Sequence, residues 1–306
     1  MPVFLMMVLG YLLHWKTPLL NDDFADCLNT FVLKIAMPAQ LFKSLSAEDF
    51  YAVWDGGMVF FCFAVSLLSI LLLLGLSLLL QDRTLRAEFV QAGYRGSQAL
   101  LGVALLQNIY GSDCGGGPLA LVLIGAVPLY NVAAVLLLTL LVPGGHLDRW
   151  TMEKAIRGIV TNPIILGIAV GLAWSLLGLP QPVVFQRLVS SLAATTTPLG
   201  LLALGACIDL KKAAGCWKPT AVASLFKLVI FAGAFLPLAV LLGYRGEALT
   251  ALLIMLASPT TVNGFSMARS MGHEGALTAS AVMLTTVCSA FTFTVWLYLL
   301  KSMALI

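Results

Sequence analysis

Three basic residues, Lys34, Arg95 and Lys227, lie deep inside long apolar stretches of the sequence, and no Asp or Glu lies comparably deep. If these stretches cross a membrane, each charge costs about 2.5 kcal/mol or more at bilayer depth, so it usually faces a cavity or a partner. An excess of buried positive charge is suited to binding an anion. The guanidinium of Arg95 could hold a carboxylate through two parallel hydrogen bonds, whereas snorkelling to an interface is the alternative for Lys34 and Lys227.

Two of the apolar stretches contain residues that interrupt helices. Arg95 lies between Gly93 and Gly96, and a second stretch contains Pro259, which lacks an amide N–H and clashes with the preceding turn. Polar or flexible residues follow this proline: Thr260, Thr261, Asn263 and Gly264. We expect both segments to unwind, so that N–H groups at the new helix N-termini attract an anion. A pair of kinked but continuous helices is the alternative.

Three further residues in the apolar stretches are candidates for a role in function. Pro38 and Pro198 are each expected to kink or break a helix, although a single membrane proline is more often a packing kink than a ligand site. Asn131 could face a cavity or could form a hydrogen bond across helices. Together, these patterns give the following candidate anion-binding residues: Lys34, Arg95, Gln98, Asn131, Thr260, Thr261 and Asn263.

The composition indicates that lipid surrounds most of the chain. Of its 306 residues, 60% are hydrophobic and 10% are charged, whereas a soluble domain carries roughly 25% charged residues. The net charge of +3 is too small to indicate nucleic-acid binding. The six cysteines are scattered, so we expect neither a disulfide nor a metal site. The sequence contains no GxSxG, no HExxH and no paired deep carboxylates, so we expect neither an enzyme nor a cofactor.

Apolar runs between charged or Gly- and Pro-rich segments predict an all-α integral membrane protein with ten transmembrane helices, since each crossing needs about 20 residues. The predicted spans are Met1–Trp15, Phe24–Leu45, Tyr51–Leu80, Ala87–Tyr110, Pro118–Val142, Ala155–Leu177, Val183–Asp209, Trp217–Gly243, Ala248–Met271 and Ala276–Leu300. The first span is too short for a hydrocarbon core of roughly 30 Å. We expect either a partial span or a start that lies downstream of a longer helix.

A recurrence of Pro and Gly divides the predicted spans into two halves of five. The matches are Pro2 with Pro163, Gly10 with Gly171, Pro38 with Pro198, and segment 93–98 with segment 258–263. Each residue lies about 160 positions from its match, and an odd number of spans per half would insert the second half upside down, as an inverted repeat with broken crossing helices four and nine. The predicted repeats are residues 1–145 and 155–306, in one membrane domain. Accidental recurrence of proline is the alternative.

The distribution of Lys and Arg outside the span interiors predicts the orientation. One side holds Lys16, Arg83, Arg86, Arg149, Lys154, Arg157, Lys211, Lys212, Lys218 and Arg269, whereas the other holds Lys43, Arg187, Arg245 and Lys301. Because cytoplasmic loops carry the excess of Lys and Arg, the first side should be cytoplasmic. We therefore expect a multi-pass protein of the cell inner (plasma) membrane with both termini on the outer face.

Several segments, in order along nearly the whole chain, resemble the auxin efflux carrier family, which comprises plant carriers and bacterial relatives that include malonate and malate permeases. The matching segments are Lys34–Leu45, Tyr94–Leu105, Val127–Val132, Asn162–Gly171, Pro198–Asp209 and Ala257–Met271. The resemblance implies ten spans in two inverted five-helix repeats, with a scaffold domain and a transport domain that moves like an elevator. It also assigns these residues to the substrate region: Arg95, Ser97, Tyr130, Asn131, Pro259 and Asn263. Relatives commonly have Asn where this chain has Ser97, so its ligand contacts are expected to differ.

The residues and the resemblance together favour a secondary transporter of a small organic anion, either a monocarboxylate or a dicarboxylate such as malate or malonate. The alternative is a non-transporting membrane sensor or lipid-binding protein on the same fold. The expected partners are the anion, membrane lipid and a coupled proton or sodium ion, without nucleic acid. His14, His146 and His273 lie near span ends, so the residues do not favour one coupling ion over the other. The fold would also be compatible with a homodimer.

Overall fold

The computed structural model describes residues 2–17, 20–46, 54–110, 117–141, 157–158, 160–207 and 215–306. Nearly all of these residues are helical, and the extended pairing found among them is an isolated antiparallel bridge between Gly96 and Thr260. The predicted connection 143–154 lies outside the described residues, as do Asp209, Lys211, Lys212 and Cys114.

The described helices follow one another in this order: α1 (Pro2–Lys16), α2 (Asp22–Phe31), the π-helical turn η2 (Val32–Ala36), α3 (Met37–Ser46), α5 (Gly56–Ser77), the 3₁₀ turn η3 (Arg83–Leu85), α6 (Arg86–Tyr94), α7 (Gln98–Tyr110), α8 (Gly117–Leu140), α10 (Pro163–Leu176), α11 (Val183–Ala206), α13 (Trp217–Leu225), the π-helical turn η4 (Phe226–Ile230), α14 (Phe231–Leu241), α15 (Gly246–Ala257), α16 (Val262–Ser270) and α17 (Ala276–Ser302). Five stretches within the described residues are long and apolar enough to cross a membrane: α5, α8, α11, the continuous α13–α14 stretch, and α17. The structure is therefore that of an all-helical membrane protein.

Local capping residues set helix starts that hydropathy alone does not locate. Asp55 accepts a hydrogen bond from the backbone N–H of Gly57 at 2.9 Å, so α5 begins at Gly56. Asn162 accepts from the N–H of Ile164 at 2.9 Å, and Pro163 occupies the first turn of α10. Asp and Asn side chains satisfy the unpaired N–H groups of a first helical turn, and proline is tolerated there because its N–H is not needed.

Pro38 and Pro198 do not break their helices, so the prediction of breaks at these positions is wrong. Helix α11 runs through Pro198 without interruption. Pro38 lies in the first turn of α3, directly after the π turn η2, where the N–H of Met37 bonds to the carbonyl of Val32. A π turn shifts the hydrogen-bond register by one residue, and it therefore accommodates a proline that has no N–H to donate.

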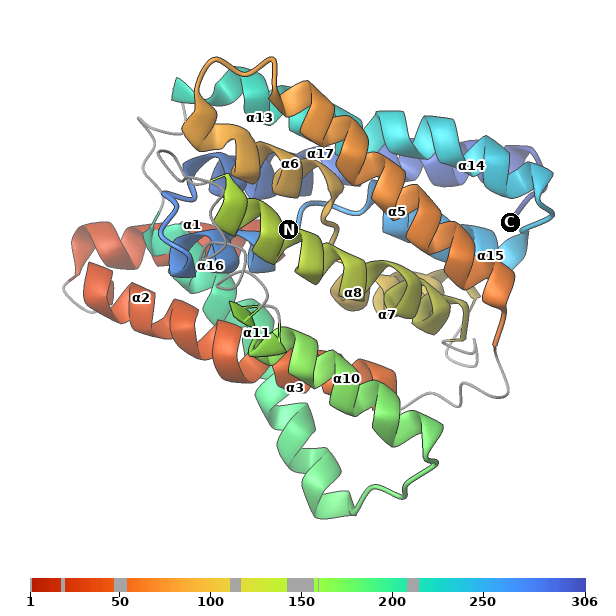
Figure 1. Cartoon of the computed structure of the whole chain (residues 1–306), viewed down its shortest axis with the longest axis horizontal. Helices are drawn as coiled ribbons and strands as arrows, with labels where there is room; N and C mark the ends of the chain where they lie inside the picture. The colour runs from red at the N-terminus through yellow and green to blue at the C-terminus, as the bar shows by residue number, and fades with distance from the viewer. Residues whose placement is uncertain are drawn as a thin grey trace.

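The helices form two groups that pack against each other (Figure 1). The α1–α11 group contains α1, α2, α3, α10 and α11, in which α1 packs along α11 and α3 packs along α10. The α5–α17 group contains α5, α6, α7, α8, α13, α14, α15 and α17, which surround the largest buried apolar cluster. Helix α16 contacts members of both groups, and contacts between the groups are sparser than those within them.

Glycines allow close helix packing inside the α1–α11 group. A Cβ atom on Gly10 of α1 would collide with the backbone of Leu202 in α11. A Cβ on Gly171 of α10 would lie only 3.0 Å from the Cα of Phe42 in α3. Small residues are typical of such membrane helix interfaces because they let backbones approach one another. Both helix pairs are therefore held by direct backbone contact.

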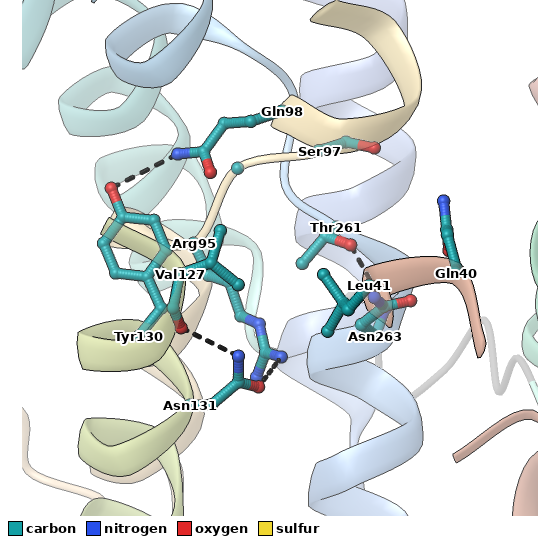
Figure 2. Close-up of a pocket in the computed structure, with 11 residues that line it drawn as sticks. Gln40, Leu41, Arg95, Ser97, Gln98, Val127, Tyr130, Asn131, Thr261 and Asn263 are labelled. Carbon is teal, nitrogen blue, oxygen red and sulfur yellow. Dashed lines mark hydrogen bonds between the residues drawn. The ribbon is translucent and has the colours of Figure 1, made fainter. Parts of the chain in front are cut away.

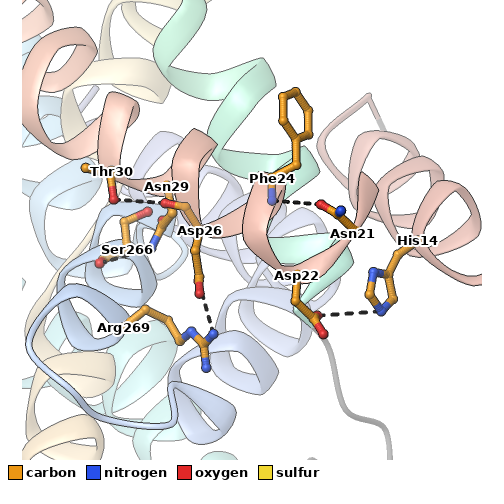
Figure 3. Close-up of polar contacts among 9 residues, drawn as sticks. All are labelled: His14, Asn21, Asp22, Phe24, Asp26, Asn29, Thr30, Ser266 and Arg269. Carbon is orange, nitrogen blue, oxygen red and sulfur yellow. Dashed lines mark hydrogen bonds and ion pairs between the residues drawn. The ribbon is translucent and has the colours of Figure 1, made fainter. Parts of the chain in front are cut away.

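Polar contacts join α2 of the α1–α11 group to α16 (Figure 3). Arg269 Nη2 lies 3.1 Å from Asp26 Oδ1, and both side chains are partly exposed. Nearby, the buried Asn29 donates from Nδ2 to the carbonyl of Ser266 at 3.3 Å. The charged pair therefore lies near the end of α16.

The outward faces of the α5–α17 group are apolar. Phe60 of α5 and Phe291 of α17 are 71% and 73% exposed, and many neighbouring Leu and Val side chains are exposed as well. A surface of this kind is suited to lipid, because contiguous apolar patches of this extent are rare on soluble monomers. The groups thus bury polar residues between helices and present apolar residues outward.

Candidate functional site

Two helices of the α5–α17 region are interrupted halfway along their length. Helix α6 ends at Tyr94, and Arg95 is extended, with φ −82° and ψ 109°. Helix α15 ends at Ala257, and Ser258 is extended, with φ −64° and ψ 147°. A residue before proline is pushed out of the helical region by the proline ring, which explains why Ser258 leaves the helix before Pro259.

The two interruptions meet and pair with each other. The N–H of Ser97 donates to the carbonyl of Pro259 at 2.9 Å, and the N–H of Thr261 donates to the carbonyl of Arg95 at 3.3 Å. Thr260 Oγ1 adds a bond of 2.8 Å to the carbonyl of Ala92. Unwound backbone inside a bilayer requires partners for its polar groups, and here each break supplies them to the other.

Gly96 is required by this close approach. A Cβ at this position would collide with Ser258 Oγ and would lie 2.7 Å from Lys227 Nζ. Gly93 and Gly264 lie inside the adjoining helices, in the last turn of α6 and the first turn of α16. Because neither glycine has a Cβ atom, the side chain of Leu73 can pack against Gly93 and that of Gln91 against Gly264. The glycines around the breaks therefore act through packing.

A small pocket opens beside the crossing point (Figure 2). Its lining consists of Gln40, Leu41, Arg95, Gly96, Ser97, Gln98, Val127, Tyr130, Asn131, Thr261 and Asn263. Its volume is about 40 Å³, which is room for a few water molecules, since each needs roughly 10–15 Å³. The pocket therefore suits a ligand of few heavy atoms.

Arg95 supplies the positive charge of the pocket. Its side chain is buried, and Nη2 donates to Asn131 Oδ1 at 2.6 Å (Figure 2). Nη1 lies 3.3 Å from the Met267 sulfur. Asn131 is itself oriented by a bond of 2.8 Å from Nδ2 to the carbonyl of Val127. Both partners of the guanidinium are neutral, and no ion pair of Arg95 is found among the described residues. Its charge is therefore available to a ligand.

Tyr130 and Gln98 form a buried polar wall beside Arg95. Gln98 Nε2 lies 3.4 Å from the Tyr130 hydroxyl, and Ser66 Oγ donates to the same hydroxyl at 3.3 Å. The Tyr94 hydroxyl donates to the Tyr130 carbonyl at 3.0 Å, and the two rings lie 5.1 Å apart at 45°. This network fixes the tyrosine against α6, so the polar lining is held in place before a ligand arrives.

The opposite side of the pocket is the N-terminus of α16. Thr261 caps this helix by accepting a hydrogen bond from the N–H of Asn263. Helix α7 begins at Gln98, which lines the same pocket, so the N-terminus of α7 also lies at the pocket. Each helix N-terminus carries roughly half a positive charge. Two such termini therefore reinforce Arg95 in attracting an anion.

Two of the predicted anion-binding residues do not line the pocket. Lys34 is exposed on the π turn η2, because the buried residues of that turn are Val32 and Ala36 and Lys34 falls between them. Thr260 is buried; its N–H donates to Thr285 Oγ1 at 3.0 Å and its hydroxyl donates to the carbonyl of Ala92 at the crossing, so both donors are already used. The structure places the remaining seven in the pocket lining: Arg95, Ser97, Gln98, Tyr130, Asn131, Thr261 and Asn263.

Gln40 is a pocket residue that sequence reasoning missed. It lies in α3, whereas the other polar lining residues lie in α6–α8 and at α16, so it approaches from the other helix group (Figure 2). The available signal was a polar side chain in the apolar run that follows Pro38. That signal could not be separated from a solvent-facing glutamine without knowing how α3 packs.

Glu88 is a buried carboxylate, but α17 satisfies its charge. Its oxygens accept from the N–H groups of Gly275 at 2.8 Å and of Leu277 and Thr278 at 3.1 Å. A carboxylate at a helix N-terminus is stabilised by the unpaired N–H groups and by the helix dipole. This residue therefore anchors α17 to α6 and leaves Arg95 without a competing acid.

Comparison with known proteins supplies the family. A family model described as "Membrane transport protein" matches residues 1–144 and 147–297. A protein of Rhizobium meliloti (strain 1021) is described as a "Putative malonate transporter". It is 26% identical over an alignment 326 residues long, which covers 100% of this chain and 96% of the relative. The helical membrane architecture and these two matches agree with the resemblance carried by the motifs. The chain therefore belongs to the membrane transport protein family, the family of the auxin efflux carriers.

Proposed function

We propose that the chain is a secondary transporter that carries a small dicarboxylate, with malonate as the first candidate, by alternating access. The observation that carries the proposal is the Arg95 guanidinium, buried at the pocket with neutral partners. About one positive charge from Arg95 and about half a charge from each N-terminus of α7 and α16 sum to about +2. This sum balances a dianion better than a monoanion.

Two further observations support a small dicarboxylate. The cavity has a volume of only about 40 Å³, which disfavours bulky aromatic anions. The Rhizobium meliloti relative is described as a malonate transporter, and malonate is a three-carbon dicarboxylate. A guanidinium suits such a ligand because it can hold one carboxylate by two parallel hydrogen bonds, while the second carboxylate can face a helix N-terminus.

We also propose that residues 1–145 and 155–306 form inverted five-helix repeats. The glycine contacts support this arrangement. Gly10 packs against Leu202, and Gly171 packs against Phe42; Gly171 lies 171 − 10 = 161 residues after Gly10, and Leu202 lies 202 − 42 = 160 residues after Phe42. The same contact is thus made twice with the halves exchanged, as a pseudo-twofold repeat requires, and five spans per half would make this repeat inverted.

In this proposal, the two helix groups move relative to each other. The α1–α11 group is the scaffold, and the α5–α17 group carries Arg95 and most of the pocket. Sparse contacts between the groups support such motion. Gln40 lies on the scaffold side of the pocket, so its contact with the ligand would exist at one end of the movement.

Uptake of labelled malonate and malate into proteoliposomes, measured as counterflow, tests the transporter proposal directly. We expect exchange of labelled malonate when unlabelled malonate is trapped inside. Melting of the detergent-solubilised protein with a panel of carboxylates, a sterol and phospholipids addresses the rival sensor or lipid-binding function. Stabilisation by lipid alone, together with no counterflow of any carboxylate, would contradict the transporter proposal.

A further inference from the structure

Lys227 is a buried cation at the crossing that is not part of the pocket lining. Its side chain is 1% exposed and lies in the π turn η4, between α13 and α14. Its Nζ donates to the carbonyl of Met255 at 2.9 Å and to the carbonyl of Tyr94 at 3.3 Å. No carboxylate pairs with it among the described residues. A buried ammonium without an acid needs another source of negative potential.

The ends of two half-helices supply that potential. Tyr94 is the last residue of α6, and Met255 lies in the last turn of α15. The C-terminus of a helix carries roughly half a negative charge, so the two ends together carry about −1. One ammonium balances them. The crossing thus separates its polar ends, with N-termini at the pocket and C-termini around Lys227.

Carbonyls at the C-terminal ends of broken helices are where secondary transporters commonly bind a coupling cation. In this chain, the side chain of Lys227 already occupies that position. Ser258 Oγ lies beside it, since both atoms would contact a Cβ at Gly96, and this hydroxyl is buried with no hydrogen-bond partner among the described residues. Two carbonyls therefore hold the ammonium as oxygen ligands would hold a small cation, and the unbonded Ser258 hydroxyl is a third oxygen close by.

We propose that Lys227 is a built-in substitute for a bound sodium ion at the crossing, so that anion transport needs no sodium there. The inference rests on the proposed transport function for its uptake measurements, but its stability measurement is independent of any anion. Lys227 is a positioning residue: it holds the ends of α6 and α15 together and so fixes Arg95, which follows Tyr94 directly.

The experiment compares wild type with three variants in sodium, choline and methylammonium chloride. Lys227→Ser removes the charge and leaves room for a cation, whereas Lys227→Met removes the charge and fills the space. Lys34→Ser is the matched control, because Lys34 lies in the other π turn but is exposed. The first readout is malonate uptake into proteoliposomes, and the second is the melting temperature in detergent without malonate.

Wild type and Lys34→Ser should take up malonate equally in all three salts. Lys227→Ser should lose uptake by about tenfold or more in choline, since the charge balancing two helix ends is gone, and should recover it in sodium or methylammonium. Lys227→Met should stay inactive in all three. The same two cations should raise the melting temperature of Lys227→Ser but not that of wild type.

Wild-type uptake that requires sodium would overturn the proposal, and this measurement needs no folded variant. A folded Lys227→Ser variant whose uptake and melting temperature are unchanged by sodium and by methylammonium would also overturn it. If wild type moves no dicarboxylate at all, the proposed transport function fails, whereas cation-dependent melting of Lys227→Ser would still support the role of Lys227.

Discussion

Replacing Arg95 by Gln should abolish anion binding without unfolding the protein. Glutamine retains a donor for Asn131 Oδ1 but removes the charge that the neutral partners of Arg95 leave uncompensated. A carboxylate about 4 Å from the guanidinium gains roughly 4 kcal/mol at an effective dielectric constant of 20. At 1.4 kcal/mol per factor of ten, that loss raises the Kd for malonate roughly a thousandfold.

The same substitution should leave the melting temperature of the anion-free protein unchanged or raise it. Wild type buries a cation without an acidic partner, and replacing an uncompensated buried charge with a neutral side chain is often stabilising. Binding is measured by the malonate-dependent shift in melting temperature, and transport is measured by uptake into proteoliposomes. Lys34→Gln is the control, because Lys34 is exposed and outside the pocket. Wild-type malonate affinity in Arg95→Gln, or an equal loss in Lys34→Gln, would refute the reasoning.

Three other predictions concern the crossing, the ligand preference and the topology. Gly96→Ala should lower the melting temperature, because overpacking against Ser258 and Lys227 should reduce the free energy of unfolding by about 1–3 kcal/mol. Gly75→Ala is the control, since a Cβ there meets no atom within 4 Å. Equal melting temperatures of the two variants would contradict the packing argument. Ser97→Asn should reduce uptake of four-carbon malate more than that of malonate, because the longer amide occupies part of a small pocket; competition uptake measures the ratio, and an unchanged ratio would remove Ser97 from the ligand contacts. The topology is tested in a background in which the exposed Cys27 is replaced by Ser. An impermeant maleimide should then label Lys218→Cys from the cytoplasm and Arg187→Cys from outside. The reverse labelling pattern would contradict the predicted topology.

Seven of the residues singled out in the sequence line one pocket, and they could be singled out because they depart from their surroundings. Gly96 and Pro259 lie in apolar runs where a helix is otherwise favourable, so their effect on the backbone is local and can be predicted. Arg95 has a high cost of burial, which requires a cavity or a partner wherever the residue lies. These arguments depend on neighbours along the chain, and the structure brings the corresponding residues together.

Other features depended on contacts that sequence spacing does not contain. Pro38 and Pro198 have the same chemistry as Pro259, yet packing and a π turn keep their helices continuous. Lys34 and Lys227 looked alike in the sequence, but only Lys227 meets two helix C-termini. Gln40 enters the pocket only because α3 lies beside it. Each difference arises from which helix lies opposite, and hydropathy does not specify that.

The paired glycine contacts, Gly10 with Leu202 and Gly171 with Phe42, have a thermodynamic consequence if the halves are inverted copies. An arrangement that looks alike from either compartment gives inward-facing and outward-facing forms similar packing energies. Neither form would then be a deep energy minimum, so the protein would not be held facing one compartment. Net flow would follow the concentration gradient and the membrane potential acting on a charged solute, so the same molecule could serve import in one cell state and export in another.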